Sequence, residues 1–66
     1  MPVVTVHQWT GRTVDQKRRL AKAITDAMVE IADARPDGLH VIFQDYELEN
    51  WARAGVLGVD RDDQET

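Results

Sequence analysis

The sequence of 66 residues contains no cysteine, so disulfide bonds and thiolate metal sites are excluded. Its two histidines, His7 and His40, are too far apart in sequence to form a recognisable ligand motif. A chain this short buries only about 60% of the surface that its unfolded form exposes, so a single copy is marginally stable. Because disulfides and metals are excluded as reinforcement, we expect the chain to form an oligomer.

Basic residues and long apolar runs are also scarce. The chain has 8 Lys and Arg residues against 12 Asp and Glu residues, for a net charge of −4. This balance argues against a nucleic-acid partner, because phosphate backbones select basic surfaces. No apolar run is long enough to cross a membrane, and no N-terminal segment resembles a signal peptide. We therefore expect a cytoplasmic protein without a membrane partner.

The first half of the chain shows one strand and one long helix. Residues Val3 to Trp9 are rich in β-branched and aromatic residues and predict a strand with apolar side chains on both faces. Thr13 is a good N-cap, and Gln16 three residues later completes a capping box. Apolar residues at helical spacing then predict an amphipathic helix from Val14 to about Ala32.

The second half contains a second strand and a short C-terminal element. Pro36 disfavours a helical conformation of the residue before it, so we expect the helix to stop there. Residues Leu39 to Asp45 predict the second strand, and the order strand, helix, strand predicts a parallel βαβ unit. Residues Ala54 to Leu57 are expected to form a short hairpin or edge strand, followed from about residue 59 by an acidic tail. The whole chain, residues 1–66, is expected to be one α/β domain.

One helix covers only one face of a two-stranded sheet. The Val, Ile and Trp side chains of the other face and the two open strand edges would be exposed in a monomer. The predicted fold therefore indicates assembly independently of any function.

Pro2, at the start of the first strand, allows two interpretations. Proline is tolerated at the first position of a strand, where its missing N–H breaks no ladder hydrogen bond. Alternatively, removal of Met1 would leave Pro2 with a free secondary amine that serves as a base or nucleophile near neutral pH. The residue alone leaves both interpretations open.

Four segments together resemble a known family. They are P-V-V-T-V-H from Pro2, G-R-T-x-D-Q-K from Gly11 to Lys17, a V-I-F strand after a helix, and E-N-W-A-x-A-G from Glu49 to Gly55. Their order and spacing resemble the 4-oxalocrotonate tautomerase family, over residues Pro2 to about Leu57. The resemblance implies a βαβ protomer that assembles as a hexamer, usually a trimer of dimers, with sites built from more than one subunit.

The resemblance also implies roles for individual residues. Pro2 corresponds to the family's base, Arg12 to an arginine that holds the substrate carboxylate, and Trp51 to an aromatic wall of the pocket, although Trp51 is equally suited to an interface. The family's second arginine is replaced by His40, which lacks the bidentate guanidinium fork. This departure predicts inefficient handling of the family's dicarboxylate substrate. Arg53 is a hypothetical substitute cation.

The expected function is therefore proton transfer within a 2-hydroxydienoate or 2-oxo acid, with no cofactor. An apolar pocket and a nearby arginine both disfavour the protonated proline, so its pKa is expected to fall toward neutrality. The alternatives are a hydratase, dehalogenase or decarboxylase, which would need a carboxylate such as Asp45, Glu47 or Glu49 near Pro2. A third hypothesis is a non-catalytic subunit of a hetero-oligomer, whose partner would supply the missing arginine.

Overall fold

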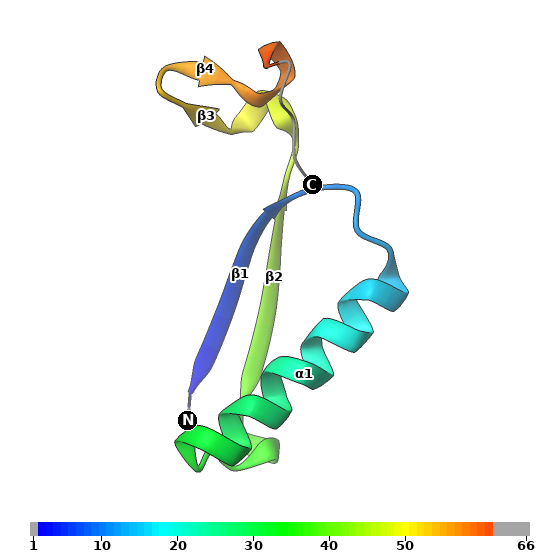
Figure 1. The fold of residues 1–66 in the computed structure, drawn as a ribbon, viewed down its shortest axis with the longest axis vertical. Helices are drawn as coiled ribbons and strands as arrows, with labels where there is room; N and C mark the ends of the chain where they lie inside the picture. Colours follow the sequence, from blue (N-terminus) through cyan, green and yellow to red (C-terminus); the bar gives the residue numbers. More distant parts are fainter. Residues whose placement is uncertain (1, 62–66) are drawn as a thin grey trace.

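The computed structural model describes residues 2–61 and shows a βαβ unit (Figure 1). Strand β1, Val3–Trp9, is followed by helix α1, Val14–Ala32, and strand β2, His40–Tyr46. The two strands are parallel, with Val3 opposite His40 and Trp9 opposite Tyr46. The α/β fold class predicted from the sequence is confirmed. No helix in residues 2–61 is long and apolar enough to cross a membrane.

Helix α1 begins and ends at the residues that the sequence predicts, Val14 and Ala32. The Thr13 hydroxyl accepts a hydrogen bond from the Gln16 backbone N–H at 3.1 Å, and the Gln16 side chain accepts one from the Thr13 N–H at 2.8 Å. This is the predicted capping box. At the other end Asp33 adopts the left-handed conformation with φ 58°, and its N–H donates to the Met28 carbonyl. The helix therefore ends at this αL cap, before Pro36.

Short elements follow α1 and β2. Within residues 2–61, three 3₁₀ turns occupy Pro36–Gly38, Leu48–Asn50 and Gly58–Asp60. The turn before β2 makes that strand begin at His40, one residue later than predicted, because the Leu39 N–H donates back to the Pro36 carbonyl.

A C-terminal hairpin is present, and it begins two residues before the predicted range of Ala54 to Leu57. It consists of β3, Ala52–Arg53, and antiparallel β4, Val56–Leu57. Ala54 and Gly55 between them both have positive φ, 53° and 79°, as in the type I′ turns that favour two-residue hairpins. The predicted acidic tail largely falls in residues 62–66, which lie outside the described residues.

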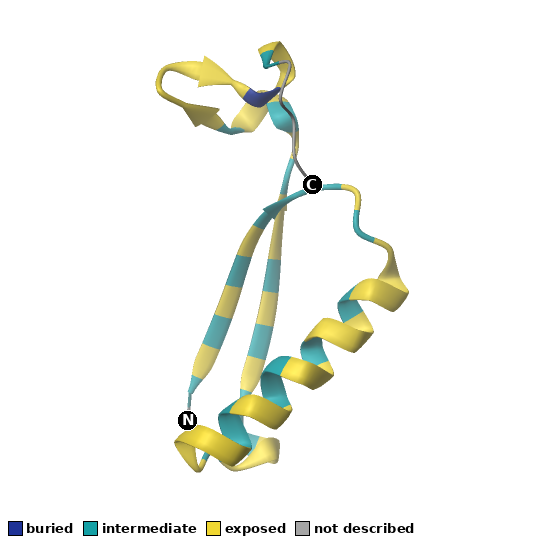
Figure 2. Ribbon diagram, in the orientation of Figure 1, coloured by how far each residue is buried: buried dark blue, intermediate teal, exposed yellow. Residues whose placement is uncertain are grey.

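Helix α1 covers one face of the sheet and leaves the other open. Burial alternates along both strands (Figure 2): Val4 and Val41 are half-buried, whereas their neighbours Val3 and Ile42 are 53% and 45% exposed. No apolar side chain in residues 2–61 is fully buried. A single chain therefore lacks a closed core, as the pattern predicts, and the open face of Val3, Thr5 and Ile42 has the character of an interface.

Candidate active site

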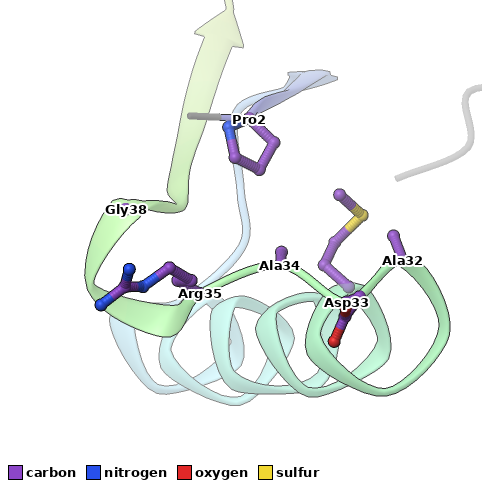
Figure 3. A pocket seen from close by; sticks show the side chains of 7 residues that line it. Pro2, Ala32, Asp33, Ala34, Arg35 and Gly38 are labelled. Carbon is purple, nitrogen blue, oxygen red and sulfur yellow. The ribbon is translucent and has the colours of Figure 1, made fainter.

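A pocket lies at the amino-terminal edge of the sheet, beside Pro2. Its volume is about 470 Å³. Figure 3 shows the Pro2 ring on one side of the pocket and the segment after α1, with Ala32, Ala34 and Arg35, on the other. The lining residues are Pro2, Met28, Ala32, Asp33, Ala34, Arg35 and Gly38. Most of these side chains are small or apolar, so the pocket disfavours the charged form of a titratable group that lies in it.

Parallel pairing explains why these residues meet. Pro2 immediately precedes β1, and the Arg35–Gly38 segment immediately precedes β2, so both lie at the same edge of the sheet. The His40 N–H donates to the Pro2 carbonyl at 3.1 Å, and the Gly38 N–H donates to the Arg35 carbonyl at 3.0 Å. These backbone hydrogen bonds connect the segment after α1 to the residue that carries the candidate base.

Arg12 and Trp51 lie at the opposite, carboxyl-terminal edge. The Arg12 guanidinium donates to the Trp9 carbonyl at 3.5 Å. The Trp51 ring meets Trp9 edge-on, with ring centroids 6.3 Å apart, and Tyr46 at 5.4 Å. This edge therefore carries a cation beside an aromatic cluster. The Trp9 indole N–H within it is buried and has no hydrogen-bond partner in residues 2–61.

The two edges are separated by the length of β1. Seven strand residues span about 23 Å at roughly 3.3 Å each. A small unsaturated acid is much shorter than this distance. Pro2 and Arg12 of the same chain therefore cannot hold one substrate molecule together.

The structure does not bring His40 and Arg53 to the pocket beside Pro2. His40 is paired with Val3 in the register of the two strands, and both residues are exposed where their neighbours are half-buried. The His40 side chain therefore belongs to the open face of the sheet. Arg53 lies on the exposed hairpin, opposite Val56 in β3 and β4. Neither of these two sequence candidates lines the pocket of a single chain.

Asp45, the first of the three candidate carboxylates, is engaged elsewhere. Its carboxylate accepts hydrogen bonds from the Lys17 ammonium on α1 and from the Gln8 amide at 3.1 Å. The bond from Lys17 is the main reason that the pKa of Asp45 lies below its ordinary value of 3.8, and the bond from Gln8 lowers it further. Asp45 thus joins the helix to both strands. No three or more His, Cys, Asp or Glu side chains within residues 2–61 are grouped so as to hold a metal ion.

Comparison with known proteins identifies the family. Residues 2–61 match the family model of the tautomerase enzymes. The chain belongs to the tautomerase family. This result confirms the resemblance drawn from the four sequence segments.

Three relatives of this tautomerase-family chain illustrate the similarity. It is 40% identical over 57 residues to a probable tautomerase of Ralstonia nicotianae, covering 86% of this chain and 88% of the relative. It is 36% identical over 55 residues to the 2-hydroxymuconate tautomerase of Bacillus subtilis, covering 83% and 89%. A 4-oxalocrotonate tautomerase isozyme structure from Methylibium petroleiphilum superimposes with a TM-score of 0.83 at 34% identity, covering 88% and 91%.

Two residues that line the pocket beside Pro2, Met28 and Arg35, are not among the sequence candidates. Met28 lies within the amphipathic helix, and Arg35 lies in the segment between that helix and the second strand. The signal that could have identified Arg35 was the parallel pairing itself, because residues just before two adjacent parallel strands lie at the same edge.

The contacts of Asp45 predict acid-sensitive stability. Because its folded-state pKa is lowered, the carboxylate contributes stability that is fully present above its unfolded pKa and is lost as pH falls through the folded pKa. Asp45→Asn should therefore lower Tm at pH 7, and the difference from wild type should shrink below about pH 4. Thermal unfolding at matched protein concentration measures this. The control is Asp26→Asn, which removes an exposed pair with Lys22 within α1; an equal effect in both variants would contradict the prediction.

Proposed function

We propose that this chain is a cofactor-independent tautomerase that converts 2-hydroxydienoates into 2-oxo acids, with the Pro2 amine as the proton carrier. The observation that carries the proposal is the pocket that Pro2 lines together with Met28 and the small residues after α1, with the Pro2 ring facing the Ala34 segment across it (Figure 3). Membership of the tautomerase family supports it, as does the similarity to a 2-hydroxymuconate tautomerase.

The reaction needs one group that accepts and returns a proton. Removal of Met1 leaves Pro2 with a secondary amine. The amine takes the proton from the 2-hydroxyl group, and the oxygen electron pair forms the carbonyl as the dienol π electrons move to a distal carbon. The protonated amine then delivers its proton to that carbon, which restores the free base. No oxidant, reductant or co-substrate is consumed.

The pocket favours the basic form of the amine. An α-amino group ordinarily has a pKa of about 7.7–8.0, and a proline amine lies higher. Partial desolvation in the pocket lined by Met28 and Ala32 disfavours the charged form, and so would the Arg12 guanidinium of a neighbouring copy. Both effects lower the pKa of the amine toward the working pH, where a general base is most effective.

The proposed site is shared between protomers of a homo-oligomer. Pro2 and Arg12 lie at opposite ends of β1, so Arg12 must come from a neighbouring copy to meet a substrate at Pro2. Trp51, which lies beside Trp9 at the same edge as Arg12, would come with it as the pocket wall. The open sheet face provides the apolar surface for such an assembly, and the proposed form is a hexamer located in the cytoplasm.

Hydration chemistry has weaker support. It needs a carboxylate that directs water at the substrate beside Pro2. Asp45 is held by Lys17 and Gln8. Asp33 lines the pocket, but Figure 3 shows its carboxylate directed away from the Pro2 ring. Glu47 and Glu49 do not line the Pro2 pocket of a single chain. Within one chain, these positions favour proton transfer over water addition.

The test is a ketonisation assay of the wild type and Arg12→Ala. Loss of a charge-assisted hydrogen bond to the substrate carboxylate should lower kcat/KM by about 10- to 100-fold. The control is Arg18→Ala, which removes an exposed arginine from α1. If the wild type turns over no 2-hydroxydienoate, the proposed activity is wrong; if Arg12→Ala matches the wild type, Arg12 is not in the site.

A further inference from the structure

We propose that Arg35 is a specificity-determining residue of the Pro2 pocket, which binds a second carboxylate at the far end of the substrate from the reacting carbon. The inference deepens the proposed function and rests on it. It assigns to Arg35 the preference for dicarboxylates over monocarboxylates. It thereby reverses the expectation, drawn from the histidine at position 40, that dicarboxylates are handled poorly.

Arg35 is the cationic member of the pocket lining. The other lining residues are Pro2, Met28, Ala32, Ala34, Gly38 and Asp33, none of which carries positive charge. Arg35 is exposed and makes no ion pair with any side chain in residues 2–61. All five of its N–H donors thus remain available to an anion that enters the pocket mouth.

The backbone holds Arg35 in place. Pro36 favours an extended conformation of the residue before it, and Arg35 has φ −86° and ψ 128°. On one side, the Ala34 N–H donates to the Met28 carbonyl at 3.1 Å; on the other, the Gly38 N–H donates to the Arg35 carbonyl. The Cα of Arg35 is therefore fixed between the end of α1 and the strand that is hydrogen-bonded to Pro2.

The direction of the side chain places the guanidinium at the rim. Figure 3 shows it extended toward the Gly38 side of the pocket, away from the Pro2 nitrogen. A carboxylate beside the reacting carbon lies near Pro2, whereas a carboxylate several carbons away reaches the rim. The planar fork of the guanidinium suits bidentate recognition of such a group. The Asp33 carboxylate, which would repel an anion, points away from the Pro2 ring in the same view.

A different role for Arg35 is compensation of the helix dipole. α1 has no basic residue in its last turn, and Arg35 follows that turn closely. Such a role would stabilise the fold and would be indifferent to the ligand. The test must therefore separate ligand preference from stability.

The experiment measures by calorimetry how tightly hexanedioate and hexanoate bind to the oligomer of chains from which Met1 has been removed. Neither ligand reacts. The wild type is expected to bind hexanedioate more tightly than hexanoate. Arg35→Ala should weaken hexanedioate binding by about 10- to 100-fold while hexanoate binding and Tm stay unchanged. Arg35→Lys should retain part of the preference, and the control Arg18→Ala should retain all of it.

Three results would overturn the proposal. In the first, the wild type binds hexanedioate and hexanoate equally well. In the second, Arg35→Ala keeps the preference for hexanedioate or weakens binding of both ligands equally. In the third, His40→Ala rather than Arg35→Ala weakens hexanedioate binding. The binding measurement does not depend on turnover. Absence of ketonisation would therefore refute the proposed function, whereas the binding data would still show whether Arg35 selects dicarboxylates.

Discussion

A chain with one alanine inserted between Met1 and Pro2 is expected to lose ketonisation activity by about 10²- to 10⁴-fold, the usual contribution of a positioned general base. The insertion converts the Pro2 nitrogen into an amide, which is neither basic nor nucleophilic. The pocket of Met28, Ala32 and Arg35 stays in place, because it is built from the end of α1 and the start of β2. Steady-state kinetics on chains of verified intact mass measure the effect.

The matched control for the insertion is Pro2→Gly. This variant keeps a free α-amine at the same position, with an ordinary pKa of about 7.7–8.0, so it should retain intermediate activity. Equal activity of the inserted chain and the wild type would show that the proline amine carries no proton.

Ile42→Glu is expected to abolish assembly. Ile42 is 45% exposed on the open sheet face, which also carries Val3 at 53% exposure. A glutamate there would place an unpaired charge in the proposed interface, at a cost of about 3–5 kcal/mol per site if it remained charged. Because no apolar side chain of residues 2–61 is fully buried within one chain, the separated protomers should also lose folded structure.

Analytical ultracentrifugation and circular dichroism measure this prediction together. The control is Val14→Glu, which introduces the same charge at an equally apolar and more exposed position, 65% exposed in the first turn of α1. There the helix dipole favours a negative charge, so assembly and helix content should persist. A stable folded monomer of Ile42→Glu would show that the open face is not required for the fold.

Local sequence signals were sufficient for the elements of the fold. The strand at 3–9, the capping box of Thr13 and Gln16, and the helix to Ala32 follow from periodicity and side-chain chemistry within a few residues. The position of the end of α1 was also predicted, but its αL cap was not, because the left-handed conformation of Asp33 is an energetically unfavourable choice that a glycine would have signalled.

The candidate site was harder to predict than the fold. Family resemblance names Pro2 and Arg12, and the strand predicted between them already places the two at opposite ends of β1, as the structure confirms. Arg35 follows an interruption of the helix and has no motif of its own, so its place beside Pro2 depends on the pairing of distant strands. The order of the elements predicts that pairing, but no local pattern shows which residue before the second strand lines a pocket.

The most direct measurement is complementation between two inactive chains. The chain with the blocked Pro2 amine and the Arg12→Ala chain are unfolded, mixed in equal amounts and refolded together, and ketonisation is then assayed. If each site joins Pro2 of one protomer to Arg12 of another, random assembly should restore about a quarter of the sites to the wild-type combination. Activity no greater than the sum of the two separate variants, in assemblies shown to be mixed, would contradict a shared proline-based site.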